Sequence, residues 1–349
     1  MEPVRLAIIG AGSIGARHAH LMRDEPDCQL VAFADPSPAE PDLPATFDVP
    51  LFSSHVEMLQ AQKPDGVVVA TPNQMHAPVG IDCANTGTHI LMEKPISESL
   101  EMGLKLVDAV SRNEIQMMVG HHRRFDPVAA AAKKIIEGGE IGALQAVTAT
   151  WSVRKHDSYF EAEWRRMIGG GPVLINLIHD IDMLRHLCGE IETVYAEQST
   201  AARGLEVEDT AAIILRFKSG ALATAVVSDA APSPWGWEMA TGENPLIPAT
   251  GENCYQFMGT KGSFGFPHIE LWQHGSENNS DWFQSIHATK PEIPERSSLA
   301  HQLSHFCRVI RGDEAPRVSG EDGLATLAAT EAVSRSFKSG RAVVPEYTL

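Results

Sequence analysis

The stretch LAIIGAGSIG at residues 6–15, followed by Asp35, decides the fold of the first part of this chain. It combines an apolar strand, a G-x-G-x-x-G turn and the start of a helix. The next strand contains VAFA at 31–34, and Asp35 lies twenty residues after the third glycine. These parts together predict a dinucleotide-binding βαβ unit, and the alternative is an ordinary strand-to-helix loop that holds no ligand.

Each glycine of this turn has its own expected role. Gly10 permits a tight turn, Gly12 lets the backbone approach a pyrophosphate, and Gly15 lets the helix pack close to the strand. The helix begins near Ser13 and Ile14, and its unpaired N–H groups are expected to hold the pyrophosphate.

Asp35 predicts which dinucleotide binds. Its carboxylate can accept hydrogen bonds from the hydroxyls of the adenosine ribose, and it would repel a 2′-phosphate. The expected cofactor is therefore NAD, with NADP less favoured.

Composition limits the classes of partner. The chain has 349 residues, which suggests two domains, and its formal net charge of -17 argues against nucleic acid or an anionic membrane surface as a partner. The five cysteines are scattered and never form a C-x-x-C pair, which is typical of reduced thiols in a cytoplasmic protein. No apolar run approaches the length that crosses a bilayer. We expect a cytoplasmic protein with a small-molecule substrate.

Strand and helix signals alternate through residues 1–122, which predicts an N-terminal Rossmann domain with a doubly wound parallel sheet. The expected strands are at 5–9, 29–34, 66–70, 89–92 and 116–119. The expected helices are at 14–23, 75–86 and 99–112.

The pattern changes in residues 123–349, for which we predict an α+β domain that binds substrate and forms oligomers. The expected strands are at 144–152, 191–200, 209–218 and 221–228, and the expected helices at 127–137, 173–188, 299–311 and 321–338. These elements predict a large, mostly antiparallel open sheet with helices on one face, and the C-terminal helix can pack back on the first domain. An uncovered sheet face favours a homodimer or homotetramer. The stretches 229–256 and 274–298 are expected to be loops.

The fourth expected strand ends in Glu93-Lys94-Pro95. Residues at the carboxyl ends of strands face the cofactor crevice in this fold, so Lys94 is a candidate for proton transfer or for polarising a substrate oxygen, and Glu93 for the cofactor site. The alternative is a surface Glu-Lys pair in a turn.

The third expected strand runs into Thr71-Pro72-Asn73, which we expect at the cofactor site. Thr71 and Asn73 can reach the nicotinamide ribose or the pyrophosphate, and Pro72 lies between them. His76 is a further candidate, although it can equally cap the following helix.

The helix expected at 173–188 carries an apolar stripe and an opposite polar face, formed by Asn176, His179, Asp182, Met183 and His186. His179 suits acid–base catalysis near neutral pH, and Asn176 is a candidate for orienting the substrate. A solvated or buried structural histidine is the alternative.

The segment GHHRRFDP at 120–127 joins the two expected domains. His122 and Arg124 are candidates for binding substrate; His121 and His122 do not predict a metal site, because no cluster with ligand spacing accompanies them. Trp164 and Arg165 are further substrate candidates, and Trp235 and Trp237 are candidate pocket walls, with core packing as their alternative.

Several stretches in this order resemble the Gfo/Idh/MocA superfamily, which includes glucose–fructose oxidoreductase and inositol dehydrogenases. They are GAGSIGARH at 10–18, ADP at 34–36, ATPNQMHA at 70–77, EKP at 93–95, GHHRRFDP at 120–127, WRR at 164–166 and GGGPVLINLIHDID at 169–182. The resemblance implies a Rossmann domain followed by an α/β domain whose large sheet commonly forms the subunit interface.

By this resemblance, Lys94 matches the catalytic lysine and His179 the histidine of a D-x-x-x-H motif. The aspartate position of that motif is Ile175 here, and Asn176 follows it. Either Lys94 or His179 can therefore be the general base.

The predicted activity is NAD-dependent hydride transfer from a secondary alcohol of a sugar, polyol, inositol or sugar acid. One alternative is a redox-neutral epimerase, oxidoreductase or glycosidase that recycles tightly bound NAD. Others are a dehydrogenase of a cyclic cis-diol and a non-catalytic NAD-binding regulator.

Overall fold

The computed structural model describes residues 2–244, 246–275, 281–293 and 297–346, which divide into two compact units. Unit 1 holds the described residues up to Phe125 together with Ser297–Leu327. Unit 2 holds the described residues between Asp126 and Arg296 together with Ala328–Glu346. Helix α9 (Ser298–Ile310), placed by the sequence in the second domain, belongs to unit 1 because it packs against α1 (Ser13–Asp24) and η1 (His122–Phe125).

Unit 1 contains the predicted parallel sheet, with the strand order β3-β2-β1-β4-β5-β6. Its strands are β1 (Val4–Ile9), β2 (Cys28–Ala34), β3 (Leu51–Phe52), β4 (Gly66–Val69), β5 (His89–Met92) and β6 (Met117–Val119). Strand β1 pairs with β2 on one side and with β4 on the other, so the strand order reverses direction at β1. Ligands bind at such a switch point, outside the carboxyl ends of the strands. The Rossmann sheet predicted from sequence is confirmed.

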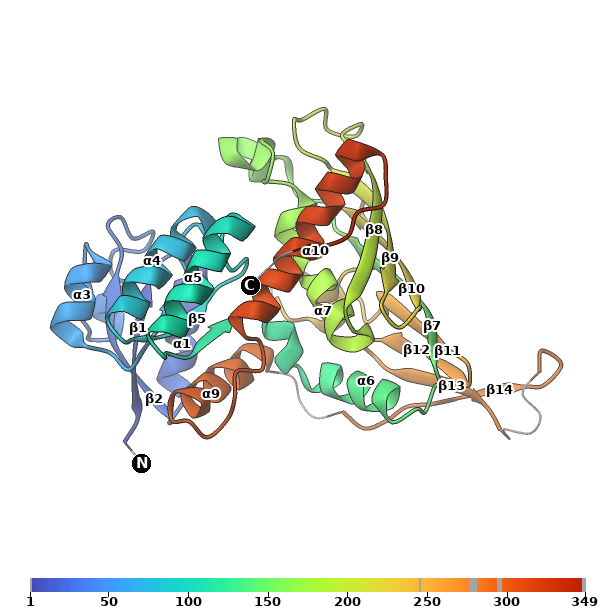
Figure 1. Ribbon diagram of the computed structural model, residues 1–349, viewed down its shortest axis with the longest axis horizontal. Helices are drawn as coiled ribbons and strands as arrows, with labels where there is room; N and C mark the ends of the chain where they lie inside the picture. Colours follow the sequence, from blue (N-terminus) through green and yellow to red (C-terminus); the bar gives the residue numbers. More distant parts are fainter. Residues whose placement is uncertain (1, 245, 276–280, 294–296, 347–349) are drawn as a thin grey trace. The chain divides into compact units, whose positions relative to one another are not determined.

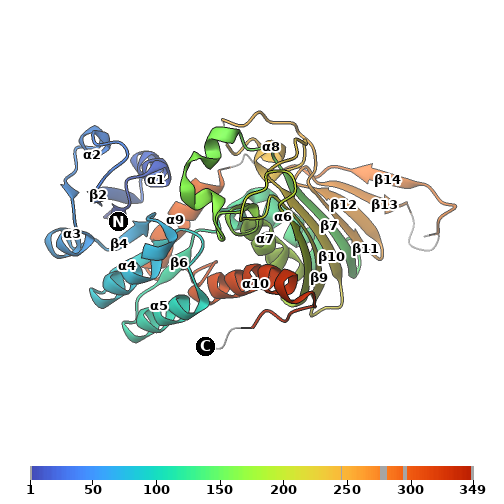
Figure 2. The same ribbon diagram turned by 90° about the horizontal axis from the view of Figure 1, so that it is seen from above.

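The remaining helices of unit 1 are α2 (Leu43–Thr46), α3 (His55–Gln62), α4 (Asn73–Asn85), α5 (Leu100–Arg112) and the first part of α10 (Gly320–Ser339). Helices α4 and α5 pack side by side (Figures 1 and 2). The sequence did not predict β3, α2 or α3. Only Met58 and Leu59 of α3 are buried, so this helix carries no apolar stripe that a pattern could reveal.

Unit 2 contains the second predicted sheet, with the order β14-β13-β12-β11-β7-β10-β9-β8. Its strands are β7 (Leu144–Ser152), β8 (Ile191–Ser199), β9 (Thr210–Phe217), β10 (Leu222–Ser228), β11 (Tyr255–Gly259), β12 (Gly262–Phe266), β13 (Glu270–His274) and β14 (Ile286–Thr289). Every pairing is antiparallel except that of β7 with β10. The mostly antiparallel sheet is confirmed.

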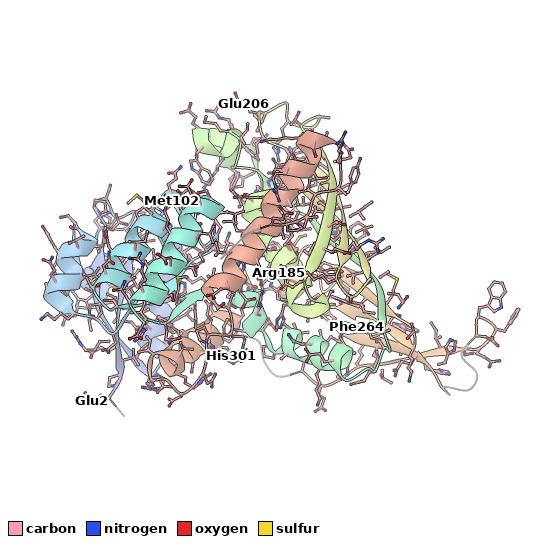
Figure 3. The ribbon with its side chains drawn as sticks, viewed as in Figure 1. Glu2, Met102, Arg185, Glu206, Phe264 and His301 are labelled. Carbon is pink, nitrogen blue, oxygen red and sulfur yellow. The ribbon has the colours of Figure 1, made fainter. Side chains whose placement is uncertain are left out.

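One face of this sheet is buried under α6 (Pro127–Glu137), α7 (Ile178–Cys188) and the second part of α10 (Figures 1 and 2). Phe264 lies in this core, stacked on Phe257 with 4.8 Å between ring centroids (Figure 3). Along β9 and β10, buried and exposed residues alternate, as expected for a sheet with one covered face.

Three expectations for unit 2 are wrong. Residues 237–241 form helix α8 (Trp237–Thr241) and residues 286–289 form β14, so both long stretches contain regular structure. Trp237 is fully buried, which confirms the core-packing alternative for this residue, whereas Trp235 is 47% exposed. The first turn of the helix expected at 173–188 is instead the π-helix η4 (Val173–Leu177).

The predicted polar face of this helix is also partly wrong, because Asp182 and Met183 are buried. Helix α7 packs against α6 as well as against the sheet, so its buried surface is wider than one stripe. Asn176, His179 and His186 do remain partly exposed.

None of the helices within the described part of the chain is long and apolar enough to cross a membrane. All five cysteines are buried and free. Among the described residues, no three His, Cys, Asp or Glu side chains gather in a way that could hold a metal ion.

Candidate functional site

The glycine turn of unit 1 has the close approaches that its sequence predicts. Gly10 has φ +101, and a Cβ there would lie 2.5 Å from the carbonyl oxygen of Ala70. A Cβ on Gly15 would lie 1.9 Å from the carbonyl oxygen of Gly10. A Cβ on Gly12 would meet nothing within 4 Å, so this glycine faces open space. The close contacts at Gly10 and Gly15 hold the turn together, and the open space at Gly12 leaves room for a ligand.

A cavity of about 740 Å³ opens at this turn. Seven of the residues predicted to bind the cofactor line it: Gly10, Gly12, Ser13, Ile14, Asp35, Thr71 and Pro72. Residues that the sequence analysis did not select also line it, among them Ser37, Ser53, Ser54, His55, Met75 and Val79. These residues come after β2, β3 and β4 in the sequence. Their position after a strand end is the one sequence signal that could have identified them as cavity residues.

Asp35 is held in place at this cavity by two backbone groups. Its Oδ2 accepts a hydrogen bond from the N–H of Ala11 at 2.7 Å, and its Oδ1 accepts one from the N–H of Ser37 at 2.7 Å. Each carboxylate oxygen retains acceptor capacity beyond these bonds. The side chain is therefore fixed at the position where a ribose hydroxyl donor would bind.

Two further features of the cavity fit a bound nucleotide. No side chain caps the N-terminus of α1, so its first N–H groups can bind a phosphate. The Oγ1 atom of Thr71 is buried, and no group among the described residues makes a hydrogen bond with it. A buried hydroxyl without a partner is costly, which indicates that a ligand supplies one. The residues present thus fit NAD.

The other predicted cofactor residues lie outside the lining of this cavity. Gly15 lies inside the turn, and Asn73 begins α4. His76 is buried, and its Nδ1 and Nε2 lie 2.6 Å and 2.9 Å from the carbonyl oxygens of Pro95 and Thr71. Burial lowers the pKa of His76, and the hydrogen bonds with the two carbonyl oxygens oppose this effect. His76 therefore connects two strand ends, and its contact with cofactor stays a prediction.

Lys94 lies two residues after Met92, the last residue of β5, and its peptide bond to Pro95 is cis. Glu93, beside it, makes an ion pair with His18 of α1, with 2.8 Å between Glu93 Oε1 and His18 Nε2. Burial would raise the pKa of Glu93, but the hydrogen bond with His18 and the charges of His18, His122 and Lys94 lower it to about 2. Glu93, the sequence neighbour of the candidate catalytic lysine, is thus ionised.

The pairing of His18 with Glu93 was not predicted from the sequence, although a signal existed. His18 shares the buried face of α1 with Gly15, Ala19 and Met22. A histidine within an apolar stripe needs a polar partner, and the acids at strand ends were the candidates.

His122 and Arg124 also belong to unit 1. Arg124 is buried, and its Nη1 lies 3.3 Å from Oδ1 of Asp322. This ion pair gives Arg124 a structural function. His122 is partly exposed, and its charge acts on Glu93. Substrate binding by either residue stays a prediction.

The other candidate residues lie in unit 2. Asn176 is in the π-helix η4 and His179 is in α7. π-Helical turns are frequent at functional sites. Lys155, which the sequence analysis missed, donates a hydrogen bond from Nζ to Oδ1 of Asn176 at 2.9 Å.

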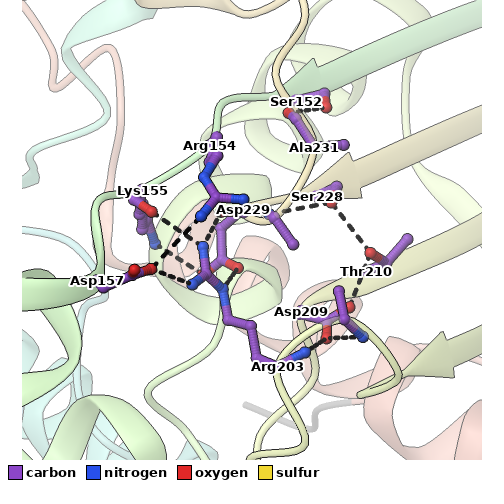
Figure 4. A network of polar contacts seen from close by, with 12 residues as sticks. Ser152, Arg154, Lys155, Asp157, Arg203, Asp209, Thr210, Ser228, Asp229 and Ala231 are labelled. Carbon is purple, nitrogen blue, oxygen red and sulfur yellow. Dashed lines mark hydrogen bonds and ion pairs between the residues drawn. The ribbon is translucent and has the colours of Figure 1, made fainter.

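Lys155 belongs to a network of charged side chains around Asp229 (Figure 4). Asp229 is almost fully buried; its carboxylate lies 3.5 Å from Nζ of Lys155 and 3.2 Å from Nε of Arg203. Burial lowers the pKa of Lys155, and the charge of Asp229 opposes this effect. The buried carboxylate of Asp229 therefore forms ion pairs with two cationic side chains.

Trp164 and Arg165 lie in η3 (Glu163–Arg166) of the same unit. Trp164 is 55% exposed, so it is available as a pocket wall. Cζ of Arg165 lies 4.0 Å from the centroid of the Tyr159 ring, and Nζ of Lys155 lies 4.6 Å from the same centroid. The predicted Arg165 and the unpredicted Lys155 thus contact the same aromatic ring.

Comparison with known proteins finds two domain profiles and several relatives that match this chain. The profile described as "Oxidoreductase family, NAD-binding Rossmann fold" matches residues 4–121, and that of the "GFO/IDH/MocA C-terminal domain" matches residues 129–265. An inositol 2-dehydrogenase of Rhizobium meliloti is 28% identical, with 97% of this chain and 98% of that protein covered. A scyllo-inositol 2-dehydrogenase (NAD(+)) of Bacillus subtilis is also 28% identical, with coverages of 97% and 96%.

A solved structure has the same fold. The WlbA dehydrogenase from Bordetella pertussis, in complex with NADH and UDP-GlcNAcA, has a TM-score of 0.77 and 25% sequence identity, with 99% of this chain and 100% of that chain covered. Two domain profiles of one family, matched in order and together spanning most of the sequence, identify the present protein. The chain belongs to the Gfo/Idh/MocA family of oxidoreductases.

Proposed function

We propose that this chain oxidises a secondary alcohol of a sugar, polyol, inositol or sugar acid with NAD as the hydride acceptor. That it is an NAD-dependent oxidoreductase acting on CH–OH groups follows from its family and from its inositol dehydrogenase relatives. The observation that carries the proposal is the cavity of about 740 Å³ at the glycine turn, with Asp35 fixed beside it and the hydroxyl of Thr71 left for a ligand.

The residues of unit 1 would hold the cofactor. The first N–H groups of α1 bind the pyrophosphate, Asp35 accepts from the adenosine ribose, and Thr71 bonds the part of the nucleotide near the end of β4. Bound NAD supplies a nicotinamide ring that takes up the hydride from the substrate carbon.

Lys94 and His179 would handle the proton of the reacting hydroxyl. An amine or an imidazole can accept it, and the group that does not can donate a hydrogen bond to the same oxygen. Holding the alcohol in this geometry supplies much of the rate, and proton transfer contributes roughly a hundredfold to ten-thousandfold. Asn176 would bind a second substrate oxygen.

We also propose that the chain forms a homodimer or homotetramer through the uncovered face of the unit 2 sheet. Large apolar side chains are exposed on its strands: Ile214 is 50%, Leu222 44%, Val226 42% and Trp272 36% exposed. An apolar sheet face of this kind favours association with a second copy. The free thiols of all five cysteines support a cytoplasmic location.

A substrate panel tests the function. The purified protein is incubated with NAD and with inositols, polyols, neutral sugars and sugar acids, and NADH absorbance is followed. We expect stoichiometric NADH with at least one of these compounds. Conversion of a compound without net NADH would instead show recycling of the cofactor, and no conversion of any compound would contradict the proposed substrate class.

A further inference from the structure

The hydrogen bond between Lys155 and Asn176 fixes which way the Asn176 amide points. An ammonium group can only donate, so the atom of Asn176 that faces Lys155 Nζ at 2.9 Å must be the carbonyl oxygen Oδ1. Nδ2, the N–H₂ end of the amide, then points elsewhere. No described residue accepts a hydrogen bond from it. The site therefore presents a donor at this position.

This polarity is opposite to the one that a D-x-x-x-H motif provides. An ionised aspartate can only accept hydrogen bonds, so it selects substrate groups that donate. The aspartate position is Ile175 here, and the neighbouring Asn176, whose Oδ1 accepts from Lys155, has its N–H₂ group left to donate. A substrate oxygen that accepts is favoured at Asn176.

Arg165 supplies a positive charge close by. Its guanidinium and the ammonium of Lys155 both contact the ring of Tyr159, and the charge of Arg165 acts on Lys155. Nη1 of Arg165 donates to the carbonyl oxygen of Tyr159 at 2.9 Å. Its buried Nε has no acceptor, and no carboxylate in the described part of the chain forms an ion pair with this side chain.

The other charges of the network do not neutralise Arg165. Asp229 is already shared by Lys155 and Arg203, at 3.5 Å and 3.2 Å. A cation that is partly buried and lacks a counter-ion is costly unless a ligand provides one. Guanidinium groups bind carboxylates with two parallel hydrogen bonds.

We propose that the substrate is a sugar acid, whose carboxylate binds Arg165 while one of its hydroxyl oxygens accepts a hydrogen bond from Nδ2 of Asn176. Lys155 is a positioning residue that holds the amide in this orientation. The inference rests on the proposed function, because it chooses among the substrates of that dehydrogenase reaction.

The test compares matched pairs of compounds that differ only in the acid group. Aldonic and uronic acids are assayed against the corresponding polyols and neutral sugars, and kcat/KM is measured from NADH formation. The wild-type protein should favour the acid by at least tenfold. In Arg165→Met this preference should fall to about one, mainly through KM, whereas the exposed neighbour Arg166 gives a matched control, Arg166→Met, that keeps it.

A second variant tests the amide directly. In Asn176→Asp the new carboxylate would pair with Lys155 and repel the substrate acid, so kcat/KM with acids should fall at least tenfold more than kcat/KM with the matched neutral polyols. Activity on neutral compounds with no preference for acids would overturn this inference and leave the dehydrogenase standing. Bound NAD with no NADH from any compound would contradict the dehydrogenase itself.

Discussion

Unit 1, which has the cavity at the glycine turn, and unit 2, which carries the proposed substrate residues, hold their polar groups by different means. In unit 1 the cavity has one carboxylate, Asp35, which is held by two backbone N–H groups, and the uncapped N-terminus of α1 offers further backbone N–H groups. In unit 2 Asn176 accepts a hydrogen bond from Lys155, a long charged side chain that shares the buried carboxylate of Asp229 with Arg203. A backbone site is fixed once the fold forms, whereas a charge network depends on each of its members.

This difference predicts where substitutions act. Most side-chain changes in unit 1 should leave the fold intact and alter one step of binding or chemistry. Changes to the charges of unit 2 should alter stability and binding together, because removing one member leaves its partners unpaired in a buried place.

Lys94 should give the largest effect on activity without an effect on cofactor binding. It lies two residues after the end of β5 and is proposed to touch the reacting oxygen. Lys94→Ala should lower kcat by roughly a hundredfold to ten-thousandfold, the usual contribution of proton transfer. The affinity for NAD, measured by fluorescence titration, should change little. Turnover at the wild-type rate would remove Lys94 from the mechanism.

Asp229 should give the largest effect on stability. Asp229→Asn removes the charge that two buried cations share, and breaking a buried ion pair in this way costs about 3–5 kcal/mol. The variant should unfold at a clearly lower urea concentration than the wild type.

An exposed pair supplies the control for Asp229. Asp108 pairs with Arg112 on the surface of α5, with both side chains more than half exposed. Asp108→Asn should cost less than about 1 kcal/mol. Equal stability losses in the two variants would show that the network of unit 2 does not depend on Asp229.

The two halves also differ in how far sequence could predict them. The strands, the glycine turn, Asp35 and Thr71 of unit 1 lie in short contiguous motifs, each with a fixed spacing. Lys155, Arg203 and Asp229 come from three connections between strands, and no local pattern relates them. A charge network of this kind becomes visible only once the sheet has brought its strand ends together.

Two local features of unit 2 could not be predicted from the sequence either. A π-helix at Val173–Leu177 has no sequence spacing of its own, and it resembles an amphipathic α-helix when judged by apolar residues. Trp237 lies in a stretch rich in Gly and Pro, which predicts a loop although five residues form α8. In both places tertiary packing outweighs the local signal.

Glu93 is a charged group of unit 1. The pH dependence of its contribution to stability tests the contrast between the two units. Its pKa of about 2 lies below the ordinary value of 4.5, so folding favours the ionised form. The resulting stabilisation, about 3 kcal/mol, is fully present above the unfolded-state pKa and is lost as the pH falls from about 4.5 towards 2. Glu93→Gln should therefore be less stable than the wild type at pH 7, and the difference should shrink over that interval.

Urea unfolding at a series of pH values measures this difference, with Glu101→Gln as the control. Glu101 pairs with Lys105 on the exposed surface of α5, so its substitution should give nearly the same stability as the wild type throughout. A Glu93→Gln deficit that stays constant down to pH 2 would mean that the ion pair with His18 does not hold Glu93 ionised.

Substitution of Thr71 should give the smallest effect of these variants. It should also separate an effect on NAD affinity from an effect on stability. Its buried Oγ1 lacks a protein partner, so Thr71→Val should leave stability unchanged or raise it slightly while NAD affinity falls by about twofold to twelvefold, the value of one hydrogen bond. Thr86 provides the opposite case in the same unit, since its hydroxyl donates to the carbonyl oxygen of Cys83 at 2.9 Å and it does not line the cavity. Thr86→Val should lose about 1 kcal/mol of stability and keep its NAD affinity. If both variants lost stability alike, the hydroxyl of Thr71 would be a structural group rather than one reserved for the nucleotide.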